Sequence, residues 1–241
     1  MGKLVVFTAT YDEAQNVDAW LDGVREAAPL GEMLVVDDNS PDGTGQILDS
    51  RAEAGMPLTV IHRSRKSGLA SAHLQAMLWT LDNGFDYLVT MDADGSHLTS
   101  QIPRLLNAIP GQDFVIGTRY RGGSHRASGL RRGLSAGANG MARILLPTGL
   151  SEYTTSFRAF NRRSMQLLVD SQFVGRGYAF FFECVELLYQ ADMRMTEVPI
   201  DFVDRAHGSS KIPKSQVVMS ALTLSSMGVR RRLGSRSVTS S

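Results

Sequence analysis

The chain has 241 residues, of which 43% are hydrophobic and 20% are charged, and its formal net charge is +1. A charge this close to zero lacks the basic excess of a general nucleic-acid-binding protein, so we expect no nucleic acid among its partners. The single cysteine, Cys184, excludes an intramolecular disulfide framework and fits a reducing compartment. The length suffices for one large α/β domain or two small ones.

Apolar β-type runs alternate with helical periodicity through the first half of the chain. The predicted strands cover residues 4–8, 33–36, 58–61, 87–91 and 114–117, and the predicted helices cover residues 17–24, 46–54 and 69–81. Alternation of this kind favours parallel strand pairing with helical crossovers. We therefore expect an α/β fold with an open, mostly parallel sheet that helices cover on both faces.

The pattern is less regular beyond Arg119. Helices are expected over residues 134–145 and 180–191, and a strand follows over 198–202. Pro199 assigns that strand to the edge of a sheet, because proline cannot donate to a central ladder. No internal repeat or low-complexity linker interrupts the chain, so residues 1–212 are predicted to form a single domain.

Two of the predicted strands end in carboxylates. Asp92 and Asp94 follow the strand over 87–91, and Asp37 and Asp38 follow the strand over 33–36. An isolated Asp-x-Asp can be an acidic turn that caps the next helix. Two acidic strand ends at the carboxyl edge of one sheet instead indicate a shared pocket. Hard oxygen donors suit Mg²⁺ or Mn²⁺, which binds one or two carboxylates together with substrate phosphates.

The turn after the first strand excludes two common nucleotide folds. It has neither the Gly-x-Gly-x-x-Gly of a dinucleotide-binding domain nor the Gly-rich loop and Gly-Lys-Ser/Thr of a P-loop enzyme. The turn is acidic, and Asp12 and Glu13 can accept hydrogen bonds from ribose hydroxyls or a base amine. Simple capping of the next helix by Asp12 is the alternative.

A series of motifs in the same order resembles one family. The motifs are Ala9–Glu13, Val36–Thr44, Lys66–Leu69, Met91–His97, Gly117–Tyr120, Arg131–Ser135, Ser156–Arg158, Gly177–Phe180 with Glu183, Glu197–Ile200 and Arg205–Lys211. Over residues 4–212 they resemble the inverting family 2 glycosyltransferases of GT-A fold, and within them the dolichyl/polyprenyl-phosphate mannose synthases. The ordered set is far more specific than any single motif.

The resemblance implies a role for each matching residue. The implied nucleotide-sugar-binding residues are Thr10, Tyr11, Asp12, Glu13, Asp38, Lys66, Asp92 and Ala93. The implied ligands of Mg²⁺ or Mn²⁺ are Asp92, Asp94 and Ser96. The implied catalytic residues are Asp94, Arg119, Arg131 and Glu183. The implied residues for an acceptor phosphate are Arg119, Arg131, Ser135, Arg158, Arg205 and Lys211.

The sequence departs from the family pattern at two informative places. Ser96 stands where many relatives have a glutamine that binds the metal. Ser156 stands where the family has glycine, so a side chain intrudes where the relatives keep backbone close to the substrate. The arginine-rich stretch after Arg119 fits phosphate oxygens, although a solvated basic loop is the alternative. Glu183 occupies the position of a base, which leaves a sugar-hydroxyl acceptor open.

The implied function is transfer of a hexose, with mannose from GDP-mannose favoured, onto a polyprenyl or dolichyl phosphate with inversion. The alternatives are a UDP-hexose or UDP-N-acetylhexosamine with a different lipid or soluble acceptor, and a non-catalytic nucleotide-sugar-binding scaffold. A sugar nucleotidylyltransferase would need a Gly-rich loop after the first strand, which is absent.

A lipid acceptor raises the question of how the chain reaches a membrane. No apolar run approaches the ~20 residues that span a bilayer, and the first residues do not resemble a signal peptide. The tail over residues 213–241 has an apolar stretch followed by a cluster of arginines, and its serine-rich end is expected to be disordered. We therefore expect a cytoplasmic protein, peripheral on the cytoplasmic face. The tail would lie on the membrane surface, dock on a small membrane subunit, or pack on the domain.

Overall fold

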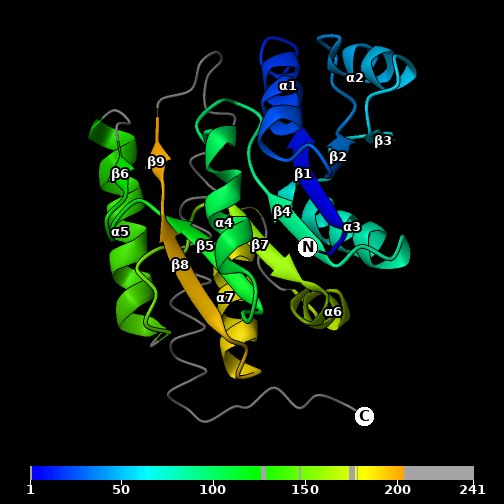
Figure 1. Cartoon of the computed structure of the whole chain (residues 1–241). Coiled ribbons are helices and arrows are strands. Elements are labelled where there is room, and N and C mark those ends of the chain that lie inside the picture. The colour runs from blue at the N-terminus through cyan, green and yellow to red at the C-terminus, as the bar shows by residue number, and fades with distance from the viewer. Residues whose placement is uncertain (1, 126–128, 147, 174–176, 178, 204–241) are drawn as a thin grey trace.

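Two sheets organise the protein, whose computed structural model describes residues 2–125, 129–146, 148–173, 177 and 179–203 (Figure 1). The strands of the seven-stranded sheet are, in spatial order, β3 (Leu58–His62), β2 (Glu32–Asp37), β1 (Leu4–Thr10), β4 (Tyr87–Thr90), β7 (Arg158–Asn161), β5 (Phe114–Thr118) and β8 (Met195–Pro199). The small sheet pairs β6 (Ser124–His125) with β9 (Asp201–Phe202).

Strand β7 gives the large sheet its mixed character. It pairs antiparallel with β4 on one side and with β5 on the other. The remaining pairs of this sheet are parallel, so the predicted mostly parallel sheet is confirmed. The sequence did not predict β7, because its four residues offer only Ala159 and Phe160 as apolar side chains between Arg158 and Asn161.

Helices cover both faces of the large sheet, as predicted (Figure 1). On one face lie α1 (Val17–Ala27), α2 (Thr44–Glu53) and α4 (Ile102–Ala108), and on the other lie α3 (Leu69–Asp82), α5 (Gly129–Leu145), α6 (Arg162–Asp170) and α7 (Ala179–Gln190). Val5 and Phe7 of β1 pack into one core while Leu4 and Val6 pack into the other. This division follows from the alternation of side chains along a strand.

Some predicted boundaries were wrong. The strand expected over 198–202 is two strands, because the chain leaves the sheet after Pro199 and continues as β9 beside β6. Its placement at a sheet edge is confirmed for β8. The helix expected over 134–145 is the second part of the longer α5. The short helices α4 and α6 were not predicted.

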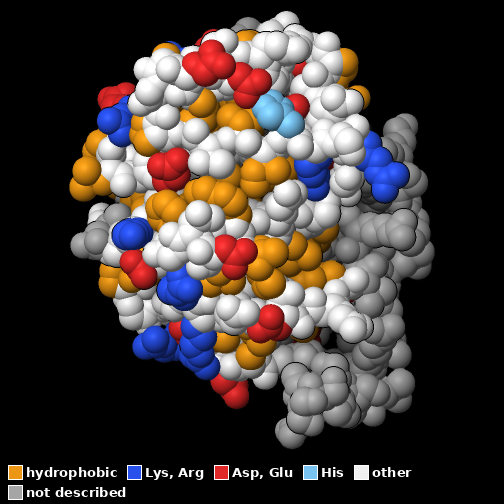
Figure 2. Space-filling model, turned by 90° about the vertical axis from the view of Figure 1, so that its right-hand side faces the viewer, with side chains coloured by type: hydrophobic (Ala, Val, Ile, Leu, Met, Phe, Trp, Pro, Cys, Tyr) orange, Lys and Arg blue, Asp and Glu red, His pale blue; other side chains and the backbone are white. Residues whose placement is uncertain are grey.

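The opposite edge of the large sheet is β3, which lies at the right of Figure 1 and faces the viewer in Figure 2. Thr59, Val60 and Ile61 of this strand are half-buried. Figure 2 shows apolar side chains gathered in a broken band on this face, with acidic and basic side chains interspersed. Charges beside an exposed strand edge disfavour pairing with another chain.

The described residues contain no helix that is long and apolar enough to cross a membrane. Residues 204–241 lie outside the described part of the chain. The predictions for the tail, and for Arg205 and Lys211, therefore stay predictions.

Candidate functional site

The candidate site lies where β1, β2 and β4 end. These strands are neighbours and parallel, with Thr10 beside Asp37 and Phe7 beside Thr90. The loops that follow them, residues 11–16, 38–43 and 91–98, therefore leave the same edge of the sheet. Open α/β folds bind their ligands at this edge.

The first two of these loops are joined by hydrogen bonds from backbone to side chain. The N–H of Asp12 donates to Ser40 Oγ at 3.1 Å, and the N–H of Glu13 donates to Thr44 Oγ1 at 3.0 Å. The N–H of Ala14 donates to Asp42 Oδ2 at 2.9 Å. These bonds fix residues 12–14 against the loop before α2 and the first residue of that helix.

The paired aspartates after β2 have different roles. Asp37 is buried and accepts hydrogen bonds from Thr10 Oγ1 at 2.8 Å and from the N–H of Ser40 at 3.0 Å. It therefore shapes the loop. Asp38 forms an ion pair with Arg63 and accepts a hydrogen bond from the N–H of Gly68 at 3.4 Å.

Arg63 is a site residue that sequence reasoning missed. Its guanidinium also donates to Ser71 Oγ at 2.7 Å and to the Gly68 carbonyl at 3.2 Å. It thus fixes the orientation of Asp38 and ties it to the loop before α3. A signal existed, since Arg63 directly follows β3, the strand next to the one that ends in Asp37.

Tyr11 and Lys66 meet across the site. Lys66 Nζ lies 3.7 Å from the centroid of the Tyr11 ring, so the loop after β3 reaches the loop after β1. A cation over an aromatic face is an attractive contact. Together with Asp38, these residues bring an aromatic ring, a cation and an anion to one place at the sheet edge. Such a set can recognise a nucleoside and its phosphates.

The predicted metal loop follows β4. Asp94 is buried, and its Oδ1 accepts the N–H of Ser96 at 3.0 Å. Between them Gly95 has a φ of +78°, a conformation that glycine adopts without strain. The Asp92 side chain is 40% exposed. Ser96 Oγ is buried and has no hydrogen-bond partner among the described residues.

These residues fit a divalent cation. The buried Ser96 hydroxyl, which has no hydrogen-bond partner among the described residues, and the buried Asp94 carboxylate are hard oxygen donors of the kind that Mg²⁺ and Mn²⁺ bind. In the described part of the chain no group of three or more His, Cys, Asp or Glu side chains could hold a metal by itself. Mg²⁺ or Mn²⁺ would therefore need oxygens from a substrate, as such ions do at diphosphate sites.

The ring of His97 joins the backbone of the metal loop to Thr155. Its Nδ1 accepts the backbone N–H of Asp92 at 3.2 Å, and its Nε2 lies 3.0 Å from Thr155 Oγ1. Burial lowers the pKa of His97 although the charges of Asp92 and Asp94 oppose this. A neutral ring that accepts at Nδ1 carries its proton on Nε2 and donates to Thr155. Sequence reasoning noted this histidine in a motif without assigning it a role.

Arg119 lies at the end of β5 in a buried ion pair with Glu152. Its Nε and Nη2 donate to Glu152 Oε2 at 2.7 Å and Oε1 at 2.8 Å, and Nη2 also donates to Thr154 Oγ1 at 2.7 Å. Burial raises the pKa of Glu152, but the charge of Arg119 and the hydrogen bonds from Arg119 and Thr154 together outweigh this and hold that pKa below its usual value. Glu152 was not predicted as a site residue.

Arg158 has an environment that differs from the expected one. It is 1% exposed, and it donates to the carbonyls of Thr155 at 2.8 Å, Tyr153 at 2.6 Å and Phe181 at 3.2 Å. Burial lowers its pKa to about 10. A guanidinium so enclosed does not reach an acceptor phosphate. We propose that Arg158 positions the segment before β7, which revises its expected role.

The other predicted acceptor and catalytic residues are only partly described. Arg131 and Ser135 lie on α5, whose side chains at these positions are outside the described set. Asn139 of the same helix accepts the N–H of Tyr153 at 2.7 Å, which joins α5 to the segment that holds Glu152. Glu183 is half-buried on α7.

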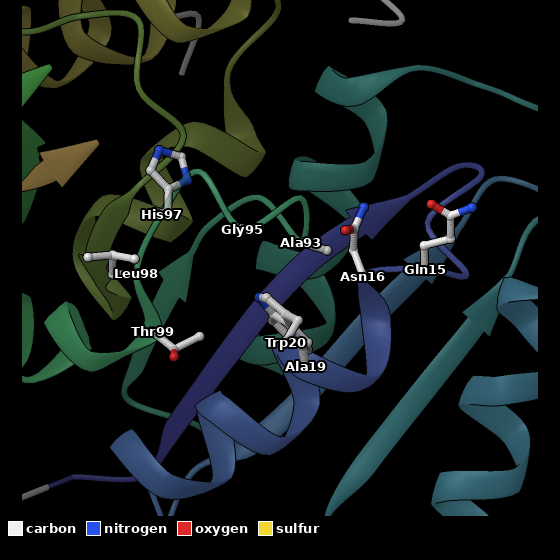
Figure 3. Close-up of a pocket in the computed structure, with 9 residues that line it drawn as sticks. All are labelled: Gln15, Asn16, Ala19, Trp20, Ala93, Gly95, His97, Leu98 and Thr99. Atoms are coloured by element: carbon white, nitrogen blue, oxygen red, sulfur yellow. The ribbon is translucent and has the colours of Figure 1, made fainter. Parts of the chain in front are cut away.

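A pocket lies between α1 and the metal loop (Figure 3). Its volume is about 230 Å³, and its lining residues include Asn16, Trp20, Ala93, His97 and Thr99. The described nucleotide-side residues Tyr11, Asp38 and Lys66 are not among the residues that line it. Ala93, which the family resemblance assigns to the nucleotide sugar, does line it, so the cavity borders the candidate site at the metal loop.

Comparisons with known proteins agree on one family. The sequence pattern of Glycosyl transferase family 2 matches residues 5–168. The undecaprenyl-phosphate mannosyltransferase of Micrococcus luteus is 34% identical over 95% of this chain and 96% of its own length. The polyprenol monophosphomannose synthase of Mycolicibacterium smegmatis is 37% identical over 96% of this chain and 89% of its own length.

A solved structure shares the fold. The glucosyl-3-phosphoglycerate synthase of Mycobacterium tuberculosis, crystallised with Mn²⁺, UDP and glucosyl-3-phosphoglycerate, superimposes with a TM-score of 0.67 at 18% identity, over 97% of this chain and 80% of that one. This confirms the predicted GT-A-type arrangement of the sheet and its helices. The matched pattern and the two bacterial relatives together place the chain in glycosyl transferase family 2.

Proposed function

We propose that the protein transfers mannose from GDP-mannose to a polyprenyl or dolichyl phosphate, with inversion at the anomeric carbon and with Mg²⁺ or Mn²⁺ as cofactor. The observation that carries this proposal is the similarity, over nearly the whole chain, to two relatives whose names specify mannose and a polyprenyl phosphate. Two oxygen donors in one loop support the metal dependence: the buried carboxylate of Asp94 and the buried Ser96 hydroxyl, which has no hydrogen-bond partner among the described residues.

In this proposal the nucleoside binds between the loops after β1 and β3. Asp38, oriented by Arg63, accepts hydrogen bonds from the base or ribose. Glu13 and Asp12 do the same from the first loop, and Lys66 balances the charge of the donor diphosphate. Asp94, Ser96 and Asp92 would hold a divalent cation, which when bound would supply further neutralisation of charge on the departing diphosphate.

The acceptor phosphate needs positioning more than activation. Its oxygen is already anionic near neutral pH, so no general base is required. That oxygen attacks the anomeric carbon from the side opposite the diphosphate. A new C–O bond forms as the old one breaks, the electron pair leaves with GDP, and the configuration inverts. The proposed residues for the acceptor phosphate are Arg119, Arg131, Ser135, Arg205 and Lys211, whereas Glu183 would act as a base only if the acceptor were a sugar hydroxyl.

The test is a comparison of donors. The full chain is incubated with a short-chain polyprenyl phosphate and Mg²⁺ or Mn²⁺, and separately with GDP-mannose, UDP-glucose or UDP-N-acetylglucosamine. Mass spectrometry should detect a mannosyl phospholipid from GDP-mannose alone. A product from a UDP-sugar would establish the alternative donor, and no product from any donor would favour a non-catalytic scaffold.

Arg63 offers a prediction specific to the nucleotide side. Arg63→Met removes the partner that orients Asp38, so we expect the dissociation constant for GDP to rise about 10-fold, the usual effect of losing a hydrogen bond to a charged group. Isothermal titration calorimetry measures this directly. Arg65→Met is the matched control, because Arg65 is exposed in the same loop. Equal GDP affinities for the two variants would contradict the assignment.

The peripheral membrane location remains a proposal that rests on the tail sequence. Deleting residues 214–241 should lower turnover of long-chain polyprenyl phosphate in liposomes by at least about 10-fold, because several arginines near an anionic surface each contribute about 1 kcal/mol to binding. Turnover of a short water-soluble analogue should stay unchanged. If both activities fall equally, or neither falls, the tail does not recruit the protein to the lipid.

A further inference from the structure

The segment before β7 lies directly beside the metal loop. Because β7 pairs antiparallel with β4, Thr90 stands opposite Arg158. The residues that precede β7 therefore run alongside the residues that follow β4. Thr90 Oγ1 donates to the carbonyl of Ser156, which fixes the position of the Ser156 backbone next to the loop that holds Asp92.

Two side chains of this segment hold Asp92 at different points. Ser156 Oγ donates to Asp92 Oδ1 at 2.7 Å. Thr155 Oγ1 contacts His97 Nε2 at 3.0 Å, and His97 Nδ1 accepts the N–H of Asp92 at 3.2 Å. The backbone of Asp92 is thus held through His97 and Thr155, whereas its carboxylate is held by Ser156.

Ser156 is suited to orient the Asp92 carboxylate. It is 4% exposed, whereas the Asp92 side chain is 40% exposed. A half-exposed carboxylate would otherwise rotate about its last side-chain bond, where rotamer wells are broad. A buried hydroxyl that donates to Oδ1 restricts this rotation, and Oδ2 lies 3.8 Å from His97 Nδ1. A glycine at this position would remove this hydrogen bond to the carboxylate.

We propose that Ser156 is a positioning residue that fixes the Asp92 carboxylate for binding of the metal–nucleotide complex. The inference rests on the proposed metal-dependent use of a nucleotide sugar. It gives the serine, which the family resemblance marked as a departure, a function. Ser156 acts through Asp92 and does not itself contact the reacting atoms.

The test measures metal binding, without turnover. Mn²⁺ is titrated into the full chain with and without GDP, and free Mn²⁺ is followed by electron paramagnetic resonance. Ser156→Ala should weaken Mn²⁺ binding in the presence of GDP about 10-fold, the usual effect of removing a residue that orients a metal ligand. GDP binding in EDTA should change by less than about two-fold, because that binding does not use the metal. Ser156→Thr, which keeps the hydroxyl, should bind Mn²⁺ as the wild type does.

Two controls separate positioning from general damage. Ser164→Ala removes a fully buried serine hydroxyl of α6 that donates to the carbonyl of Asn161 at the end of β7, and it should leave Mn²⁺ affinity unchanged. In an Asp92→Asn background, Ser156→Ala should weaken Mn²⁺ binding by less than about a further two-fold, because the carboxylate that Ser156 orients is gone.

The outcomes distinguish this inference from the proposed function. Equal Mn²⁺ affinity in Ser156→Ala and wild type would overturn the inference alone. The inference would also be overturned if Ser156→Ala weakened GDP binding in EDTA as much as it weakens Mn²⁺ binding. The same holds if it still weakened Mn²⁺ binding about 10-fold in the Asp92→Asn background. If the wild type binds Mn²⁺ with GDP no better than Asp94→Ala does, the proposed metal site fails and the inference fails with it.

Discussion

Asp94→Ala is expected to reduce mannosyl transfer by about 10³-fold, since metal stabilisation of a leaving group supplies several kcal/mol. The variant removes the buried carboxylate of the metal loop and leaves the Ser96 hydroxyl without its neighbour. Initial rates with GDP-mannose and a short-chain polyprenyl phosphate, measured over a series of Mn²⁺ concentrations, provide the readout. Excess EDTA should abolish the wild-type activity in the same assay.

The matched control for Asp94 is Asp170→Ala. Asp170 is an exposed carboxylate at the end of α6, and its loss should leave the rate unchanged. Circular dichroism of both variants should match the wild type, because Asp94 contributes to a loop and not to a core. An active Asp94→Ala protein, or full wild-type turnover in EDTA, would remove the metal from the mechanism.

The second large effect concerns stability. Glu152→Gln keeps the shape of the side chain but leaves the Arg119 guanidinium buried without its counter-charge. Breaking a buried pair in this way costs about 3 kcal/mol of unfolding free energy, a substantial part of what a domain has. Urea unfolding at pH 7 measures the loss. Glu53→Gln, an exposed substitution on α2, is the control and should cost nothing measurable.

The stability difference should depend on pH in one direction. The folded pKa of Glu152 lies below its ordinary value of 4.5, so its charge stabilises the protein fully above about pH 4.5. That contribution is lost as the pH falls through the folded pKa, where wild-type Glu152 becomes protonated as well. The gap between Glu152→Gln and wild type should therefore narrow in acid. A constant gap would show that geometry, and not charge, explains the loss.

Most of the fold could be predicted because its first half obeys simple periodicities. Buried parallel strands such as β2 are continuous apolar runs, and α1 presents Val17, Trp20, Leu21 and Val24 at helical spacing. Strand β7 could not be predicted, because it is short and begins with an arginine. Only the tertiary structure, with three carbonyls around the Arg158 guanidinium, stabilises that charge inside a sheet.

The candidate site divides in the same way. Asp38, Asp92 and Asp94 could be predicted because a carboxylate after an apolar strand is visible in sequence. Arg63, the partner of Asp38, and Glu152, the partner of Arg119, could not be assigned, because each lies on another loop and meets its partner only when the strands pair. His97 lies on the same loop as Asp92, but its contact with Thr155 exists only in the folded structure. The sequence also cannot distinguish an arginine that binds a phosphate from one that, like Arg158, donates to backbone carbonyls.

The pocket beside the metal loop has a practical consequence. Trp20 forms part of its wall, and the indole Nε1 is buried without a hydrogen-bond partner among the described residues. Indole emission depends on polarity and on hydrogen bonding at this nitrogen, and Trp79 is the only other tryptophan in the sequence. Replacing Trp79 by phenylalanine would leave a single tryptophan, in the wall of the pocket that Ala93 and His97 also line (Figure 3). The protein thereby carries its own optical reporter for movements of the loop that holds Asp92 and Asp94.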